Sequence, residues 1–123
     1  FYDKSSSIWE EIWGEHMHHG YYVQGMKPKT IEDHRLAAQR FMINRSLEWA
    51  GVEEGASAPK TGVDIGCGIG GSSRHIHRRY GTSMTGITLS PVQRDRAQAI
   101  SEAEGVGDKC KFQVSCLCTK SQK

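Results

Sequence analysis

A short stretch in the middle of the chain, residues 63–71, constrains the fold more than any other. It reads Val-Asp-Ile-Gly-Cys-Gly-Ile-Gly-Gly, an apolar segment that ends in a loop of alternating glycines. Val63 and Ile65 predict the end of a buried parallel strand, and residues 72–80 predict a helix that stops at Gly81. Strand, glycine loop and helix in this order predict an α/β fold.

The spacing of the glycines indicates a place where a ligand touches the backbone, because glycine turns the chain tightly and carries no Cβ atom. The series Gly66-x-Gly68-x-Gly70 departs from the dinucleotide fingerprint, and no Gly-Lys-Ser/Thr follows as in a Walker loop. Asp64 would repel a pyrophosphate but pair with a cationic amino group, which S-adenosylmethionine carries beside its sulfonium. On these residues alone, a plain strand-to-helix turn remains the alternative.

Two separate parts of the chain, one around the glycine loop and one at the N-terminus, resemble one enzyme family. Val-Asp-Ile-Gly-Cys-Gly-Ile-Gly-Gly-Ser-Ser-Arg at residues 63–74, with Gly-Ile-Thr-Leu-Ser-Pro-Val-Gln at 86–93, resembles the class I methyltransferases that use S-adenosylmethionine. Within that class the chain is most similar to the γ-tocopherol methyltransferases of plants and algae. The start of this chain resembles the N-terminus of those enzymes in two stretches, Phe-Tyr-Asp at residues 1–3 and Trp-Gly-Glu-His-Met-His-His-Gly-Tyr-Tyr at residues 13–22.

The resemblance implies the fold, the cofactor and the reaction. The fold would be the N-terminal part of a Rossmann-like, doubly wound methyltransferase sheet with a helical, aromatic-rich N-terminal lid. The cofactor would be S-adenosyl-L-methionine, and the acceptor a small, lipid-like phenol methylated at a ring carbon, as in the conversion of γ- to α-tocopherol. The family also implies a plastid location.

Candidate cofactor residues follow the same pattern. The residues expected around the methionine portion are Asp64, Gly66, Cys67, Gly68 and Gly70. Thr88 stands about twenty residues past the glycines, where many nucleotide-binding domains carry an acid for the ribose. The residues expected at the nucleoside are therefore Thr88, Leu89 and Gln93, with neutral hydrogen bonds in place of a charged one. Tyr2 is expected to offer its aromatic face to the sulfonium.

The histidines between Gly14 and Gly20 are expected in a loop, and neither a carboxylate nor a cysteine at ligand spacing completes a metal site. Histidine has an unperturbed pKa near neutrality, so the candidates for a base that accepts the phenol proton are His16, His18 and His19. The cysteines, at positions 67, 110, 116 and 118, also lack the spacing of a zinc site or a disulfide framework. We expect no metal and reduced thiols.

Composition excludes several classes of protein. The 123 residues allow one domain at most, and a formal net charge of +2 with 37% hydrophobic residues gives no electrostatic case for binding nucleic acid. No apolar run is long enough for a transmembrane helix, and no targeting segment is visible. Because the chain begins at Phe1 rather than methionine, we expect a fragment or a processed form.

We expect residues 1–52 to form the lid. It should hold a short helix capped by Ser7 and a long helix from Thr30 to about Ala50, ended by Gly51. One side of the short helix should pack on a core through Ile8, Trp9, Ile12 and Trp13. The long helix should contribute to the core through Leu36, Ile43, Leu47 and Ala50.

After a linker at residues 53–60, residues 61–114 are expected to form a partial cofactor-binding domain. Its second strand should span residues 82–88. A second helix should begin with Ser90 as its cap, run to residue 104 and stop at Gly105. The third strand should alternate Cys110, Phe112 and Val114 with polar residues.

Residues 115–123 carry neither the acid nor the apolar period that similar methyltransferases have after this strand, and we interpret them as an unrelated tail, of the kind that truncation or wrong splicing would produce. Three hypotheses stay open. The chain is an incomplete phenol C-methyltransferase, a catalytically silent remnant, or part of an enzyme that methylates an alkaloid nitrogen, a sterol or a small amine. The oligomeric state is not predicted.

Overall fold

The computed structural model describes residues 8, 10–27 and 29–115. Residues 8 and 10–13 are helical, and the further elements follow in the order α2 (Ile31–Trp49), η1 (Gly55–Ser57), β1 (Thr61–Ile65), α3 (Gly71–Tyr80), β2 (Ser83–Thr88), α4 (Pro91–Ala103) and β3 (Cys110–Val114). The predicted α/β order is therefore confirmed. Ser7, Trp9, Tyr2 and the tail at 116–123 lie outside the described residues, so the expectations placed on them stay predictions.

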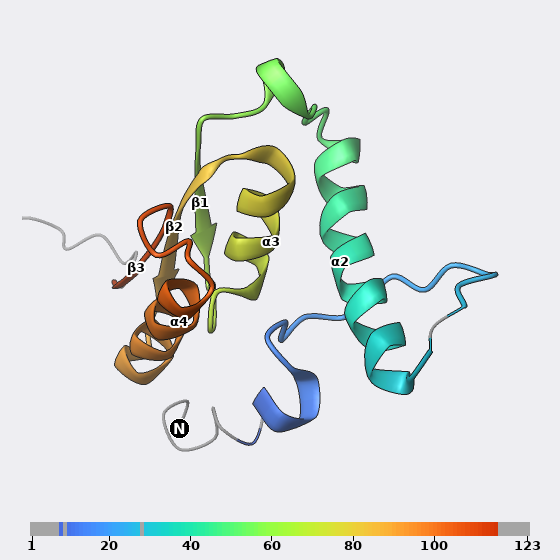
Figure 1. The fold of residues 1–123 in the computed structure, drawn as a ribbon, viewed down its shortest axis with the longest axis horizontal. Coiled ribbons are helices and arrows are strands. Elements are labelled where there is room, and N and C mark those ends of the chain that lie inside the picture. Colours follow the sequence, from blue (N-terminus) through green and yellow to red (C-terminus); the bar gives the residue numbers. More distant parts are fainter. Residues whose placement is uncertain (1–7, 9, 28, 116–123) are drawn as a thin grey trace, which may run out of the picture.

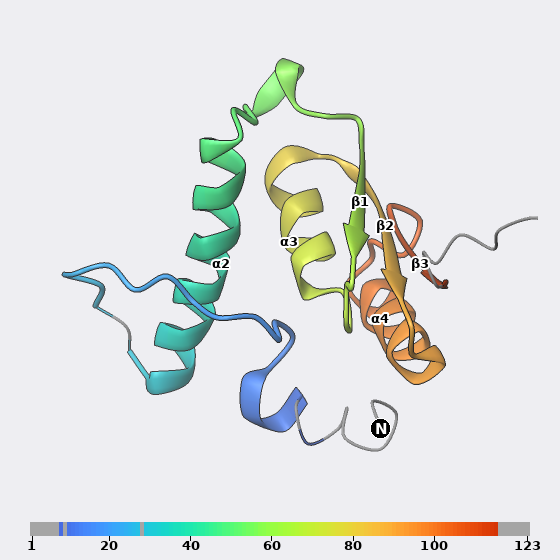
Figure 2. The same cartoon turned by 180° about the vertical axis from the view of Figure 1, so that it is seen from behind.

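The three strands form one parallel sheet in the order β1-β2-β3. In register, Asp64 pairs with Gly86 and Gly86 with Phe112. Helix α3 lies between α2 and the sheet in both views (Figures 1 and 2). The arrangement is the partial Rossmann-like parallel sheet that the sequence predicted, with helices over one of its faces among the described residues.

One face of the sheet carries the core. The buried cluster consists of Cys67, Met84, Ala97, Cys110 and Phe112, with Ile76 and Val106 packed against it. The opposite face of β1 is open, because 62% of Val63 and 65% of Ile65 is exposed. The prediction that these two side chains are buried is wrong for the described residues, which place no helix over them.

Helix α2 begins as predicted but does not join that core. The Thr30 side chain caps it by accepting a hydrogen bond from the Asp33 N–H at 3.0 Å, and Gly51 ends it at a φ of 78°. Its buried residues are Ala38 and Gln39. The expected core positions Leu36, Ile43 and Leu47 are only partly buried, and Ala50 is exposed.

The reason is that the most buried face of α2 packs on the backbone of the N-terminal segment, while its Phe41 stacks on the ring of Tyr21. The Gln39 amide donates to the carbonyl oxygens of His16 and His18 at 2.6 and 3.0 Å. A Cβ atom at Gly20 would lie only 2.6 Å from the Ala38 Cβ, so the absence of a side chain there permits the close approach. The described residues of the short first helix likewise differ from expectation, since Ile8 and Ile12 are more than half exposed.

The remaining elements follow the sequence signals. Ser90 caps α4 by accepting from the Gln93 N–H, Pro91 is the first helical residue, and Gly81 ends α3 at a φ of 69°. Cys110 and Phe112 of β3 are buried, whereas Val114, expected inside, is 43% exposed at the end of the strand.

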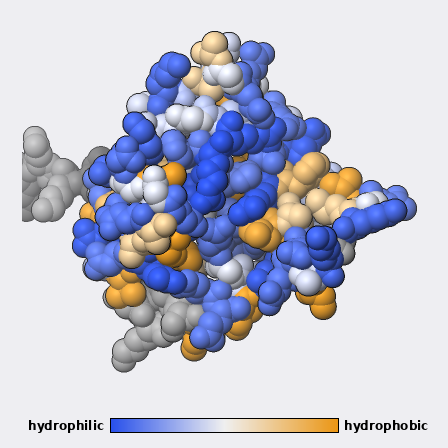
Figure 3. All heavy atoms as spheres, viewed as in Figure 1, coloured by the Kyte–Doolittle hydropathy of each residue, from blue (hydrophilic) through white to orange (hydrophobic). Residues whose placement is uncertain are grey.

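The surface shown in Figure 3 is mostly hydrophilic, with scattered apolar groups. Among the described residues, no helix combines the length and the apolar character that crossing a bilayer requires.

Candidate cofactor site

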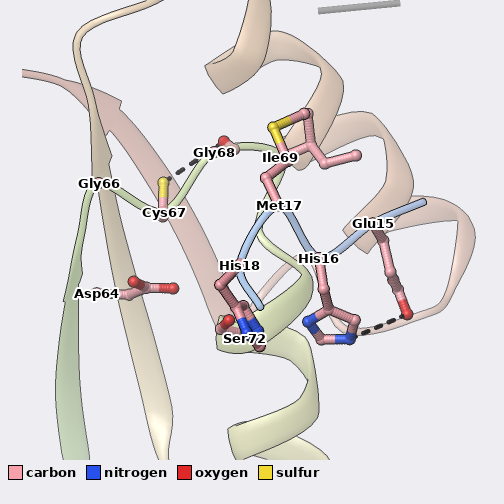
Figure 4. A pocket seen from close by; sticks show the side chains of 10 residues that line it. All are labelled: Glu15, His16, Met17, His18, Asp64, Gly66, Cys67, Gly68, Ile69 and Ser72. Atoms are coloured by element: carbon pink, nitrogen blue, oxygen red, sulfur yellow. Dashed lines mark hydrogen bonds and ion pairs between the residues drawn. The ribbon is translucent and has the colours of Figure 1, made fainter. Parts of the chain in front are cut away.

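A cavity of about 130 Å³ lies at the carboxyl end of β1, between the glycine loop and the N-terminal segment. Figure 4 shows Asp64 on one wall and the segment from residue 15 to 18 facing it. The lining residues are Glu15, His16, Met17, His18, Asp64, Gly66, Cys67, Gly68, Ile69 and Ser72. The structure thus brings the predicted acid, most of the glycine loop and two of the three candidate histidines together.

The three alternating glycines have two different roles. All three have positive φ, at 78°, 55° and 81° for Gly66, Gly68 and Gly70. A Cβ atom at Gly66 would meet no heavy atom within 4 Å, and one at Gly68 only the Met17 sulfur at 3.8 Å. A Cβ atom at Gly70 would instead overlap the Phe112 ring. Gly66 and Gly68 therefore leave space on the cavity side, whereas Gly70 permits core packing and does not line the cavity.

Asp64 is held in place by the first turn of α3. The Ser73 hydroxyl donates to its Oδ2 atom at 2.7 Å, and the carboxylate points toward the middle of the cavity (Figure 4). Because one hydroxyl occupies only one of the two carboxylate oxygens, Oδ1 can accept hydrogen bonds from a ligand.

Cys67 contributes its backbone to the cavity, but its thiol belongs to the core. Burial, together with the nearby charge of Asp64, raises the pKa of the Cys67 thiol to about 12. A Cβ atom at Gly86 would lie 2.9 Å from its sulfur, which shows how closely the thiol packs on β2. The group stays protonated at neutral pH and is not a nucleophile.

His16 is fully buried and carries no charge at neutral pH. Burial lowers its pKa to about 4, although the Glu15 carboxylate, 3.7 Å from Nε2, acts in the opposite direction. Neither ring nitrogen has a hydrogen-bond partner among the described residues. A group with so low a pKa is a weak base at neutral pH.

His18 and His19 differ in position. His18 lines the cavity, and its Nδ1 lies 2.8 Å from the carbonyl oxygen of His19. A carbonyl can only accept, so Nδ1 carries the proton. His19 is exposed and does not line the cavity.

An ion-pair network that sequence reasoning missed fixes the N-terminal segment over the loop. Arg74 of α3 is fully buried, and its Nη2 donates to the Glu15 carboxylate at 2.9 Å. The same guanidinium donates to the Ile69 carbonyl at 2.7 Å and pairs with Glu104 at 3.2 Å. Burial raises the pKa of Glu15. The hydrogen bonds from Arg74 and Arg40, together with the His16 ring, lower that pKa by more than burial raises it, so the pKa lies below the usual value.

The predicted nucleoside residues lie outside the cavity. Thr88 and Gln93 are buried and bonded to each other, with Thr88 Oγ1 donating to Gln93 Oε1 at 2.9 Å. The Thr88 hydroxyl also accepts from the Ser90 N–H at 3.2 Å. Leu89 is 65% exposed at the carboxyl end of β2. In the described part of the chain, no three His, Cys, Asp or Glu side chains are grouped in a way that could hold a metal ion.

The parallel sheet and glycine loop are those of the S-adenosylmethionine-dependent methyltransferase class. The chain belongs to the family described as mycolic acid cyclopropane synthetase, whose model matches residues 1–117. The similarity inferred from the two sequence strings is therefore confirmed at the level of the family.

Several of the sequence relatives are plant methyltransferases. A probable chloroplastic tocopherol O-methyltransferase of Oryza sativa subsp. japonica is 53% identical over 114 residues, 92% of this chain and 31% of the relative. The chloroplastic tocopherol O-methyltransferase of Arabidopsis thaliana is 46% identical over 94% of this chain and 34% of its own length. Norajmaline N-methyltransferase of Rauvolfia serpentina is 39% identical over 93% and 39%, respectively. The chain thus spans about a third of the length of these relatives.

Among solved structures, the (4+2)-cyclase SpnF superposes with a TM-score of 0.75 at 21% identity, over 98% of this chain and 42% of that one. This likeness shows the fold alone. A cyclase on the same fold also means that function has to be argued from the site.

Proposed function

We propose that the chain is the cofactor-binding part of an S-adenosylmethionine-dependent methyltransferase whose acceptor is a tocopherol-type phenol. The observation that supports this most is the pairing of Asp64 with two open glycines at the carboxyl end of β1. The identity to tocopherol methyltransferases supports the acceptor. S-adenosylmethionine would supply a methyl group made electrophilic by its sulfonium.

The cavity suits the amino-acid end of this cofactor. Its volume of about 130 Å³ is well below the ~300–1,000 Å³ of sites that enclose a whole ligand. The free oxygen of Asp64 would accept from the ammonium group, while Gly66 and Gly68 allow the ligand to approach the backbone. The Cys67 backbone completes this wall, and Gly70 supports it by packing.

The nucleoside would extend out of the cavity toward the carboxyl end of β2. Leu89 offers an exposed apolar surface for the adenine there. Thr88 and Gln93 would hold the loop after β2 in shape through their mutual hydrogen bond and offer their remaining lone pairs to the ribose. Tyr2 stays a proposed contact of the sulfonium.

For the acceptor we propose methylation at a ring carbon ortho to the phenol oxygen. The names of the tocopherol relatives specify O-methylation, so the site of transfer is a point that the product itself must decide. The similarity to norajmaline N-methyltransferase favours an amine nitrogen as the second candidate acceptor. Methylation of the phenol ring requires removal of the phenol proton, whereas methylation of an amine nitrogen does not.

We also propose the division into a lid (1–52), a linker (53–60) and a cofactor-binding part (61–114). A plastid location is proposed from the chloroplastic relatives.

Calorimetric titration of the purified chain with S-adenosylhomocysteine tests the cofactor site. We expect saturable heat, and its absence between micromolar and millimolar ligand would contradict binding and favour a silent remnant. Incubation of the longer protein with labelled S-adenosylmethionine, γ-tocopherol and amines, followed by NMR of the product, tests the acceptor. A methyl group on nitrogen or on oxygen would overturn the ring-carbon proposal.

A further inference from the structure

Three histidines close to the cofactor cavity are candidates for the base of the proposed reaction, and the structure distinguishes them. His16 is a weak base because burial keeps it neutral down to a pKa of about 4. His19 is exposed and does not line the cavity. His18 differs from both, because it lines the cavity and its hydrogen bonding leaves one nitrogen without a partner.

The tautomer of His18 follows from its backbone contact. Nδ1 lies 2.8 Å from the His19 carbonyl oxygen, which can only accept, so the proton resides on Nδ1. Nε2 is then a bare acceptor. It is shielded from solvent and has no hydrogen-bond partner among the described residues. An unsatisfied, oriented imidazole nitrogen is the arrangement that a general base requires.

His18 also lies where two different surfaces meet. On one side is the cavity with Asp64 and the glycine loop. On the other is an apolar groove of about 450 Å³ between α2 and α3, lined by His18 together with Met42, Ile43, Leu47 and Ile76 among others. His19 also lines this groove, so His18 differs from it in lining the cofactor cavity as well. An acceptor with a polar ring and a hydrocarbon tail could place its ring at His18 and its tail in the groove.

Resting on the proposed function, we infer that His18 is the catalytic base, taking the proton of the acceptor's phenolic O–H through Nε2 while the groove holds the acceptor's hydrocarbon tail. The O–H bond breaks toward Nε2, and its electron pair makes the ortho carbon nucleophilic. That carbon forms the bond to the methyl group, and the pair of the broken S–C bond stays on sulfur. The ring carbon then loses its proton while the oxygen regains one from His18, so one proton is released overall.

Among the described residues, the titratable side chains near His18 belong to the cavity and to the groove, which His19 also lines. The His16 ring lies 5.4 Å away, edge to face, and Glu15, Asp64 and Cys67 line the same cavity.

A bound chromophoric phenol tests the inference without turnover. In the chain saturated with S-adenosylhomocysteine, 2-dodecyl-4-nitrophenol is titrated with base, and the absorbance of its phenolate gives its apparent pKa. We expect binding to lower that pKa by about one to three units through proton transfer to His18. His18→Gln and His18→Phe should abolish the shift, while 4-nitrophenol without the tail should bind at least about tenfold more weakly.

The matched control is His77→Gln, because His77 also donates from Nδ1 to a carbonyl, that of Thr82 at 3.0 Å, but lies away from the cavity. It should leave the shift unchanged. Should the His18 variants fail to fold, long-range ¹H–¹⁵N correlations on the wild-type chain still report the tautomer. A proton on Nε2, an unshifted phenol or no phenol binding overturns the inference about His18. Absence of S-adenosylhomocysteine binding overturns the proposed function instead.

Discussion

The two walls of the cavity are built by different means. The glycine loop, residues 66–71, is shaped by local rules: a strand end, positive φ angles and the start of α3. The facing segment, residues 14–19, has no regular structure after its first turns. It is fixed by distant partners, chiefly Arg74 and Gln39, which bond to Glu15 and to the backbone of the histidines.

This difference separates what a sequence shows from what only a fold shows. A loop made by glycine spacing is visible in a few consecutive letters. A segment held by a buried charge 59 positions away is not. Substitutions on one wall of the cavity should change the stability of the chain by a different amount from substitutions on the other wall.

The largest effect should come from removing the charge that holds the histidine segment. Arg74→Met removes the buried cation that Glu15 and Glu104 share, and breaking a buried pair typically costs about 3–5 kcal/mol. Because both carboxylates are partly exposed and keep Arg40 and Arg78 as partners, we expect about 3 kcal/mol. Urea denaturation should show a loss of this size in the free energy of unfolding. Arg78→Met is the control, since Arg78 meets Glu104 at the surface and should matter by about 1 kcal/mol or less. Equal effects of the two variants would contradict the role of Arg74.

A smaller loss is expected on the other wall. Gly70→Ala adds a Cβ atom into the Phe112 ring at a φ of 81°, which combines overpacking with left-handed strain, together about 2–4 kcal/mol. Gly81→Ala provides the comparison, because a Cβ atom there meets nothing within 4 Å and only the strain of about 1–2 kcal/mol applies. Adding Phe112→Leu to Gly70→Ala should recover part of the difference. Thermal unfolding of the four chains measures it, and no recovery would argue against the packing role of Gly70.

Acid should lower the stability of the packing around the facing segment, residues 14–19, before it affects the glycine loop. Burial holds the pKa of both His16 and His75 near 4, against 6.5 for an ordinary histidine. The unfolded chain therefore binds more protons than the folded chain between these values, so stability is complete above pH 6.5 and falls as the pH drops toward 4. Below pH 4.5, protonation of Glu15 removes a further contribution, since its folded pKa lies below the usual value.

The decline should be on the order of 3 kcal/mol for each of the two histidines, read from denaturation curves at several pH values. His16→Phe and His75→Phe should each flatten the curve between pH 6.5 and 4. A flat wild-type curve over this range would show that neither histidine is buried in its neutral form.

Much of the α/β part could be predicted from the sequence. The helix ends are set by residues that act within a few positions. Helices start at the caps Thr30 and Ser90, and they stop at Gly81 and Gly105, which have positive φ. The core face assigned to α2 was only partly right, because the residues it buries most deeply, Ala38 and Gln39, pack on the backbone of a loop that carries no apolar pattern. Arg74 could not be recognised either, since a buried arginine looks like any surface arginine until its partners are known.

The glycine wall also shows how far a residue pattern determines a role. Three glycines at alternate positions look equivalent in the sequence. The structure separates Gly66 and Gly68, which face open space, from Gly70, which faces Phe112. Spacing predicts where the chain turns, but the neighbours of each Cβ position decide whether a ligand or the core needs the glycine.

The central claim, that Asp64 binds the amino group of the cofactor, is tested most directly by one paired titration. S-adenosylhomocysteine and 5′-methylthioadenosine share the nucleoside and the sulfur, but only the first carries the amino-acid end. Asp64→Asn, which keeps the size and an acceptor for Ser73, should weaken S-adenosylhomocysteine at least about tenfold, or about 1.4 kcal/mol, and leave methylthioadenosine unchanged. Equal weakening of both ligands, or of neither, would contradict the claim.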